Sequence, residues 1–268
     1  EYEPKATSDN VLDIWMISRT HELVRQATKG YDAYLLDDAV RGIADVIDDI
    51  SVWYTRRSRE RLKGDTGEED KKLAYETLTY VLITLTKVIA PVMPFIAERM
   101  YLDLGGKKES VHLETWPEVG EINDEVLVTM KKTREAVSSA LMKRTEAKVN
   151  VRQPLTLLTI TTELSEEYLT IIKDEVNVKR VAVGAELLLD TELTPELVRE
   201  GELRNLMRAI QDARKEKGLS PKDEIEVKLL FGEDYFGEDF NKDLMKTCNI
   251  KRVVWNDATV DQAKKFSF

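Results

Sequence analysis

Residues 36–63, LDDAVRGIADVIDDISVWYTRRSRERLK, combine two patterns that decide the predicted fold. Apolar residues recur three or four positions apart, which is the spacing of one face of an α-helix. The series runs through Ile50, Trp53 and Tyr54 and reaches Arg57 and Arg61 in the same phase. We therefore predict one long helix, from about residue 32 to residue 62, whose apolar face ends in arginines.

Similar spacing predicts helices on both sides of this stretch. The first should have Ser8 or Asp9 as its N-cap and Gly30 as its last residue, with His21 on its solvated face. Two prolines in APVMPF (90–95) should interrupt the helical pattern. The later helices should cover residues 69–89, 94–104 and 123–147. Helices joined by short connections predict an antiparallel bundle.

The composition changes after Val149. Residues 154–161 and 178–184 are rich in β-branched side chains and should be strands, as should 223–231. Between the last two lies a strong helical pattern, with Thr194 as N-cap, Pro195 in the first turn and Gly218 as C-cap. We expect a mainly α protein: a helical domain at 1–149, a small α+β domain at 150–268, and no internal repeat.

The bulk composition restricts the possible functions. The 268 residues include 42% hydrophobic and 34% charged residues, as expected for a soluble globular protein. No apolar run approaches the roughly 20 residues that cross a membrane, and the single cysteine fits a reducing, cytoplasmic setting. The net charge of -10 argues against non-specific nucleic-acid binding. Any nucleic acid must therefore bind to a local basic surface.

Catalytic and metal-binding patterns are missing from the sequence. His21 and His112 lie far apart and belong to no metal-spaced cluster, and Cys248 has no second cysteine to join. We find no phosphate-binding glycine loop and no nucleophile motif. The sequence therefore predicts no catalytic residue and no metal ligand, and the chain resembles a binding module.

Cationic residues are concentrated in three places. Residues 52–63 hold five cations and one glutamate, although Arg57 and Arg61, one helical turn apart, should repel each other by about 0.2–0.5 kcal/mol. Intramolecular pairs would offset this repulsion, with candidate partners Glu60, Glu98, Asp48 and Asp49. Phosphate groups of RNA would also offset it, because arginine binds phosphate bidentately and stacks on bases.

The other two cationic groups lie at residues 131–152 and along the helix at 194–218. Both are also compatible with an ordinary solvated helix face. The candidate RNA-contacting residues from all three groups are Trp53, Arg56, Arg57, Arg59, Arg61, Lys131, Lys132, Arg134, Arg152, Arg204, Arg208 and Lys215.

Six segments resemble the C-terminal part of the isoleucyl-tRNA synthetase family, in family order. They are NVLDIWMISRTHELV (10–24), DDISVWYTRRSRERL (48–62), AYETLTYVLITLTKVIAPVMPFIAERMY (74–101), SVHLETWPE (110–118), KVNVRQPL (148–155) and LTPELVREGELRNLMRAIQDARKEKGLSPKDEIEV (193–227). They are distributed between residues 10 and 227, so the resemblance extends over nearly the whole chain. The segment from Trp53 to Arg61 is the sharpest marker.

The resemblance implies a class I synthetase whose helical bundle binds the anticodon of a transfer RNA. The α+β part resembles the C-terminal domain of the archaeal and eukaryotic-like branch, because a single cysteine excludes the four-cysteine zinc module of some bacterial members. The parent enzyme would join isoleucine to its tRNA with ATP and magnesium. The family's catalytic motifs and editing domain are missing from this sequence. We therefore expect a fragment, inactive alone, that binds tRNA and packs on the missing catalytic domain.

Two alternatives remain open at this stage. The first is the corresponding region of a valyl or another class I synthetase, which shares the helical domain and the APxxPFxAE pattern. The second is a non-catalytic helical scaffold that binds protein partners. Such a scaffold would show an exposed apolar patch rather than a cationic face.

Overall fold

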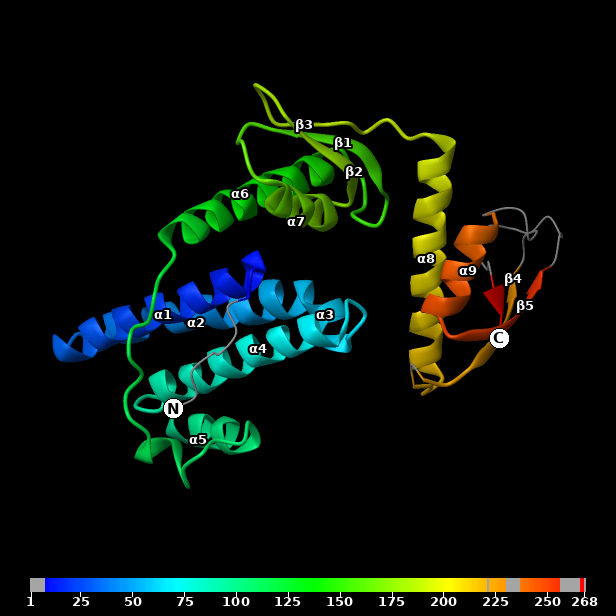
Figure 1. Ribbon diagram of the computed structural model, residues 1–268. Helices are drawn as coiled ribbons and strands as arrows, with labels where there is room; N and C mark the ends of the chain where they lie inside the picture. Colours follow the sequence, from blue (N-terminus) through cyan, green and yellow to red (C-terminus); the bar gives the residue numbers. More distant parts are fainter. Residues whose placement is uncertain (1–7, 221, 230–236, 256–265, 268) are drawn as a thin grey trace. The chain divides into compact units, whose positions relative to one another are not determined.

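The computed structural model describes residues 8–220, 222–229, 237–255 and 266–267 (Figure 1). The chain forms two compact units, Glu1–Lys131 and Lys132–Phe268. The first is a helical bundle and the second combines helices with two small sheets. The predicted fold class, mainly α with a small α+β part, is confirmed, whereas the predicted domain boundary after residue 149 stays a prediction.

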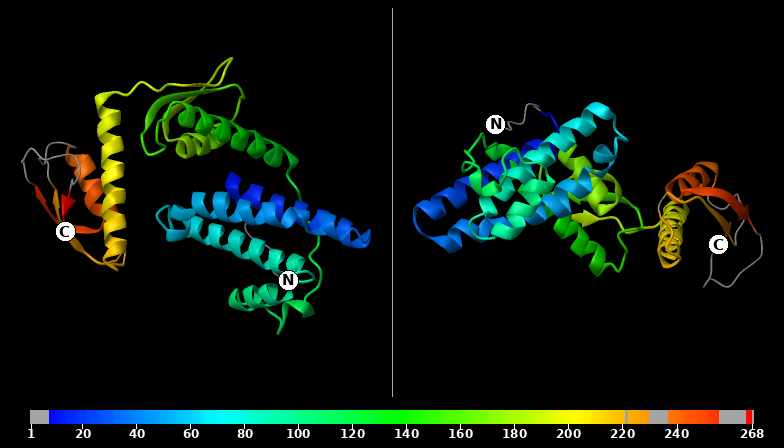
Figure 2. Two further views of the ribbon diagram at one scale, coloured as in Figure 1. Left: turned by 180° about the vertical axis from the view of Figure 1, so that it is seen from behind. Right: turned by 90° about the horizontal axis from the view of Figure 1, so that it is seen from below.

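In the first unit, α1 packs along both α2 and α4 (Figures 1 and 2). Trp15, Met16, Val24 and Val81 are almost completely buried in its core. The elements are α1 (Val11–Asp32), α2 (Leu36–Asp48), the π-helix η1 (Asp49–Thr55), α3 (Arg59–Lys63), α4 (Glu68–Ile89), α5 (Pro94–Asp103) and the 3₁₀ helix η2 (Val111–Leu113). Helix α6 (Asp124–Glu146) begins in this unit and continues into the second.

The ends of α1 differ from the prediction. The N-cap is Asn10, whose side chain accepts a hydrogen bond from the Leu12 backbone N–H, rather than Ser8 or Asp9. Gly30 does not end the helix, which continues to Asp32. A Cβ atom at Gly30 would lie 2.5 Å from the backbone nitrogen of Ala39. The glycine therefore permits close approach of α2.

His21 is also placed differently from the prediction. It is buried rather than solvated, with its Nδ1 atom 2.7 Å from the Glu121 carbonyl oxygen and its Nε2 atom 2.6 Å from the Tyr80 hydroxyl. The histidine therefore joins α1 to α4 and to the segment before α6. Polar partners, which a sequence pattern does not reveal, make its burial favourable.

The single long helix predicted for residues 32–62 is divided into α2, η1 and α3. In the wider π-helical turn the buried positions follow a four-residue spacing, through Val46, Ile50, Tyr54 and Ser58. The sequence pattern predicts that Arg57 and Arg61 lie on the same buried face, but Arg57 is only half-buried because of this change in spacing. Arg61 is buried, as its position on the apolar face predicts.

Arg61 and the fully buried Asp13 form the central polar contact of the helical unit. The guanidinium donates two hydrogen bonds to the Asp13 carboxylate, at 2.8 and 2.7 Å, and a third from Nε to Asp70 at 2.7 Å. Asp13 also accepts from the Tyr54 hydroxyl and the Ser8 hydroxyl, each at 2.6 Å. One carboxylate on α1 therefore holds η1, α3 and the segment before α1.

This network shifts the pKa values of its members. Burial and the adjacent Asp13 carboxylate raise the pKa of Tyr54. Burial alone would lower the pKa of Arg61, but the hydrogen bonds and charges of Asp13 and Asp70 outweigh it and raise that pKa. The partners of Arg61 are therefore Asp13 and Asp70 rather than the acidic residues expected from the sequence. Among those, Asp49 pairs with Arg19 at 2.8 Å.

The second unit contains two three-stranded sheets of the same design. In each, a central strand pairs in parallel with the strand that follows its helix and antiparallel with a short third strand. The elements after α6 are β1 (Leu155–Ile160), α7 (Glu166–Val176), β2 (Val178–Val183), β3 (Leu188–Leu189), α8 (Pro195–Glu216), β4 (Ile225–Leu229), α9 (Glu238–Thr247), β5 (Ile250–Trp255) and β6 (Phe266–Ser267).

These two sheets are parts of an internal repeat, so the prediction of no repeat is wrong. The first copy (residues 144–189) has the order β1, α7, β2, β3 after α6, and the second copy (residues 214–267) has β4, α9, β5, β6 after α8. The sequences share little beyond NVKRV (177–181) and NIKRV (249–253). The repeat is therefore evident from the strand pairing rather than from the letters.

A buried arginine occupies the same place in both copies. Arg144 donates to the carbonyl oxygens of Asn150 and Gln153, six and nine residues later, and to those of Val176 and Asn177 at the end of α7. Arg214 likewise donates to the carbonyl oxygens of Ser220 and Asp223, six and nine residues later. It also donates to that of Cys248, the C-cap of α9. The negative end of a helix dipole therefore faces each buried guanidinium.

Replacing Arg61 tests whether the pair with Asp13 holds the helical unit together. Arg61→Ala leaves the Asp13 carboxylate buried without its counter-charge, which should lower the free energy of unfolding by about 3–5 kcal/mol. Chemical denaturation measures this change. The exposed Arg59 of the same segment is the matched control, since Arg59→Ala should change stability by less than about 0.5 kcal/mol. Equal effects of the two substitutions would contradict the assignment.

The stability of the chain should also fall in acid. Burial tends to raise the pKa of Asp70, but hydrogen bonds from Thr66 and Arg61 lower it overall. A hydrogen bond from the Tyr101 hydroxyl lowers the pKa of Glu114, and the nearby Lys87 lowers it further. A carboxyl whose pKa is lower in the folded state stabilises the fold above its unfolded pKa of about 4 and loses that contribution as pH falls through the folded pKa.

We therefore expect the melting temperature to fall as pH is lowered from about 5 to about 3. Circular dichroism melts across this range measure the fall. The double variant Asp70→Asn and Glu114→Gln should be less stable at neutral pH and should lose less further stability in acid. An unchanged acid dependence in that variant would show that other groups cause it.

Candidate nucleic-acid interface

The arginine-rich segment at residues 51–63 divides into exposed and buried members. Arg56 and Arg59 are exposed, and the Arg56 Nε atom donates to the Val52 carbonyl oxygen at 3.0 Å. Trp53 and Arg57 are half-buried. Arg61 lies inside the bundle, where N–H groups on the edges of its guanidinium donate to Asp13 and Asp70. Of the residues in this segment that were predicted to contact RNA, Arg61 is buried and paired, so its role is to stabilise the fold.

The α6 candidates lie at the point where the two compact units meet in the chain. Lys131 and Lys132 are exposed, and Arg134 is half-buried. Lys131 closes the first unit and Lys132 opens the second. These residues therefore remain candidates on exposure alone.

The cationic stripe predicted on α8 is only partly a free basic surface. Arg208 pairs with Asp212 at 3.3 Å, and Arg204 pairs with Glu200 at 2.8 Å. Lys215, near the end of the helix, is exposed. Gln211 donates to the Thr247 carbonyl oxygen and so serves packing against α9. The acidic residues on α8 reduce the net charge that the stripe presents.

The structure brings two of the predicted residues, Arg152 and Arg204, to one place. Arg152 is exposed in the turn before β1. Asn177, which follows α7, donates from Nδ2 to the Val151 carbonyl oxygen at 2.7 Å and accepts a hydrogen bond from Arg204. Burial, with a further contribution from the Arg204 charge, lowers the pKa of Arg144 to about 10. This region therefore holds several cations close together.

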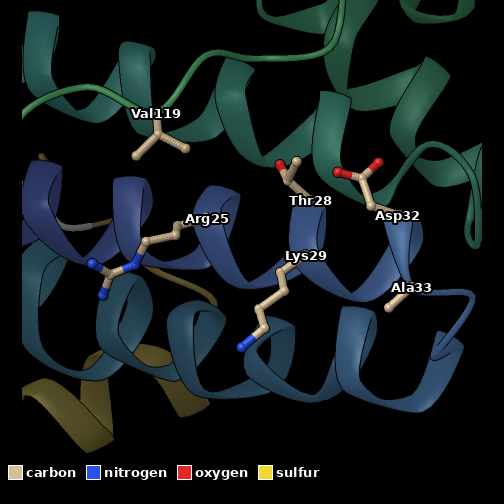
Figure 3. A pocket seen from close by; sticks show the side chains of 6 residues that line it. All are labelled: Arg25, Thr28, Lys29, Asp32, Ala33 and Val119. Carbon is tan, nitrogen blue, oxygen red and sulfur yellow. The ribbon is translucent and has the colours of Figure 1, made fainter.

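A hollow of about 490 Å³ on α1 was not predicted from the sequence. Figure 3 shows Arg25, Thr28, Lys29 and Asp32 following one another along α1, with Val119 contributed by a crossing segment. Their spacing of three, one and three residues places them on one face of the helix. The hollow therefore offers two cations and a carboxylate around a partly apolar surface.

An aromatic pair outside the lining of this hollow contacts one of its lining residues, Thr28. The Trp116 ring meets the Tyr31 ring edge to face, with centroids 5.5 Å apart, and its Nε1 atom donates to Thr28 Oγ1 at 2.8 Å. Trp116 is 37% exposed, so part of its ring is open to solvent. Single-stranded RNA is commonly bound by aromatic rings that stack on bases together with cations that contact phosphates. Sequence analysis did not predict this contact, because Trp116 lies in a connector and a connector has no periodicity that indicates which helix it contacts.

Other classes of site find little support in the part of the chain that is described. No group of three or more His, Cys, Asp or Glu residues there could hold a metal ion. No helix there is long and apolar enough to cross a membrane. Cys248 is the buried C-cap of α9, and burial raises the pKa of its thiol.

Comparison with known proteins identifies relatives that match most of this chain. Isoleucine–tRNA ligase of Clostridium acetobutylicum is 39% identical over 200 residues, which cover 71% of this chain and 19% of that protein. Isoleucine–tRNA ligase of Thermoplasma acidophilum is 31% identical over 232 residues, which cover 82% of this chain and 23% of that protein. The chain thus spans about a quarter or less of the length of these relatives.

The match to a protein family falls mainly on the helical unit and its hollow. Residues 13–160 match the family described as the anticodon-binding domain of tRNA ligase. This range contains the Asp13–Arg61 pair, the hollow on α1 and the arginine-rich segment, and it is more than half of the 268 residues. The chain therefore belongs to the family of anticodon-binding domains of tRNA ligases.

Proposed function

We propose that this chain is the tRNA-recognition part of an isoleucine–tRNA ligase. The observation that carries the proposal is the family match over residues 13–160, on a bundle whose hollow is lined by Arg25 and Lys29 and lies beside the partly exposed Trp116. The relatives named isoleucine–tRNA ligase support the choice of isoleucine. The valyl and other class I alternatives predict a different preferred tRNA.

In this proposal the hollow on α1 receives an unstacked base of the anticodon loop. Trp116 offers a ring face for stacking, and Asp32 offers an acceptor for a base amino group. Arg25 and Lys29 would contact the phosphates on either side of that base. Exposed Arg56 and Arg59 would extend the phosphate contacts, which set the affinity and its salt dependence but not the sequence preference.

The joining of isoleucine to tRNA would take place in a catalytic domain outside this chain. ATP and magnesium would be bound there, as the resemblance to class I synthetases implies. Contact with such a domain is supported by an apolar groove of about 530 Å³ lined by α2 residues and by Val92 and Met93. We infer a cytoplasmic location, where tRNA and a free thiol such as Cys248 are both expected.

The isolated chain should bind isoleucine-accepting tRNA and should not charge it. Fluorescence anisotropy between about 50 and about 200 mM salt should show an affinity that falls linearly on logarithmic axes. An aminoacylation assay with ATP, magnesium and isoleucine should give no product. Affinity equal to that for random RNA would contradict anticodon recognition, and tighter binding of valine-accepting tRNA would favour the valyl alternative. Absence of any RNA binding would favour the scaffold alternative.

Substitutions in the hollow should weaken tRNA binding without unfolding the chain. The double variant Arg25→Ala and Lys29→Ala removes two exposed cations and should reduce affinity roughly tenfold, with a salt dependence shallower by about two phosphate contacts. The matched control, Arg41→Ala and Lys72→Ala, removes two exposed cations elsewhere in the same unit. Equal losses of affinity in both double variants would show that the hollow has no particular role.

A further inference from the structure

The two copies of the repeat share one exposed feature, a group of three cations. In the first copy it consists of Arg152, Lys179 and Arg180, and in the second of Lys222, Lys251 and Arg252; all six side chains are exposed. We name these groups the first and second basic clusters. Each combines a residue three positions before the central strand with the Lys-Arg pair that follows the first residue of the next strand.

Similar parallel strand pairs build both clusters, but β4 and β5 shift register after Ile225, so Arg180 lies opposite Leu157 whereas Arg252 lies opposite Glu226. Leu155 of β1 lies opposite Val178 of β2, and Ile225 of β4 lies opposite Ile250 of β5, so each turn and each Lys-Arg pair meet at the same end of a parallel strand pair. A left-handed asparagine precedes each pair: Asn177 with φ of 56° and Asn249 with φ of 48°.

The two asparagines also connect the turn to the strand in the same way. Asn177 Nδ2 donates to the Val151 carbonyl oxygen, and Asn249 Nδ2 donates to the carbonyl oxygens of Lys222 and Asp223 at 2.9 and 3.1 Å. Each asparagine thus fixes the turn that carries Arg152 or Lys222 beside its Lys-Arg pair. The clusters are therefore held in place by backbone geometry rather than by flexible side chains alone.

Buried and exposed cations both contribute charge to each cluster, although carboxylates also adjoin the second, where Glu226 lies opposite Arg252. Arg144 and Arg214 lie buried beneath the two turns and add a fixed positive charge to each. Lys179 pairs with Glu200, and Lys251 lies 3.8 Å from Glu224, so one cation in each cluster is partly neutralised. The remaining cations, Arg152, Arg180, Lys222 and Arg252, form no ion pair among the described residues.

A purely structural explanation accounts for only part of this pattern. Strands β2 and β5 are edge strands, and charged side chains on an edge prevent pairing with another chain. That requirement explains the Lys-Arg pairs but not the cations in the turns. Other exposed positions of the copies differ, for example Thr156 in β1 and the corresponding Glu226 in β4. Exposed acidic residues also correspond, as do Glu166 and Glu238 at the first positions of α7 and α9, so the cations belong to a charge pattern that both copies keep.

We propose that the two basic clusters are equivalent binding sites for the phosphate backbone of one RNA molecule. The inference rests on the proposed function, so the RNA is a tRNA, and the clusters would bind it outside the anticodon. Phosphate contacts carry no sequence information. The clusters would therefore add affinity for every tRNA equally, while the hollow on α1 supplies the preference.

The test compares charge-removing variants of the intact chain. Arg152→Gln with Arg180→Gln neutralises the two unpaired cations of the first cluster, Lys222→Gln with Arg252→Gln those of the second, and a quadruple variant combines the four substitutions. Fluorescence anisotropy with isoleucine-accepting tRNA and with one other tRNA gives affinities across a salt series. The control quadruple variant, Arg41→Gln, Lys72→Gln, Arg99→Gln and Lys242→Gln, removes the same total charge from exposed positions.

Each double variant should lose affinity roughly tenfold for both tRNAs, with a salt slope smaller by about two. The quadruple variant should lose about the product of the two. Circular dichroism melts should match those of the unaltered chain, because all four side chains are exposed. Cluster variants that bind like the control quadruple variant would overturn the inference and leave the proposed function intact. Failure of the unaltered chain to bind any tRNA would overturn both.

Discussion

The helical unit depends on satisfying the Asp13 carboxylate, which is fully buried on α1. A buried charge without a partner costs several kcal/mol, so the chain must bring a counter-charge to it. Arg61 supplies that charge from α3, while Tyr54 and Ser8 complete the hydrogen bonds. The wide turn of η1 places Ser58 rather than Arg57 inward and still lets Arg61 reach Asp13. The arginine-rich segment is therefore first a structural element and only secondarily a charged surface.

The second unit buries arginines by a different route. Arg144 and Arg214 donate to backbone carbonyl oxygens, several of them at the ends of α7 and α9, where the helix dipole is negative. Because carbonyl groups occur in every sequence, this solution needs only one arginine and one turn of the right length. It can therefore persist in two copies whose other residues have diverged. It also leaves the buried positive charge without a carboxylate partner among the described residues.

Hydrophobic periodicity predicted the helices, the strands and the fold class, because burial of one helix face or one strand face is a local property of the sequence. It failed where a long-range polar contact decides the position, as for His21 beside Tyr80, and it placed Arg61 on the buried face without identifying Asp13 as its partner. The repeat was missed because strand pairing and a buried arginine define it, and neither requires matching letters. The hollow was missed because Val119, which completes its lining, comes from a connector without periodicity, and sequence spacing does not place a connector against α1.

These contacts also explain how an acidic chain can carry a selective RNA-binding surface. Three arginines of the predicted or neighbouring basic stretches, Arg61, Arg144 and Arg214, are buried in the fold. In the proposed function, the acidic surplus would repel RNA over most of the surface and would confine binding to places where cations remain exposed. One cluster of two or three such cations binds phosphate weakly. Two clusters on one chain that engage the same RNA molecule gain from effective concentration, and their combined affinity exceeds either alone.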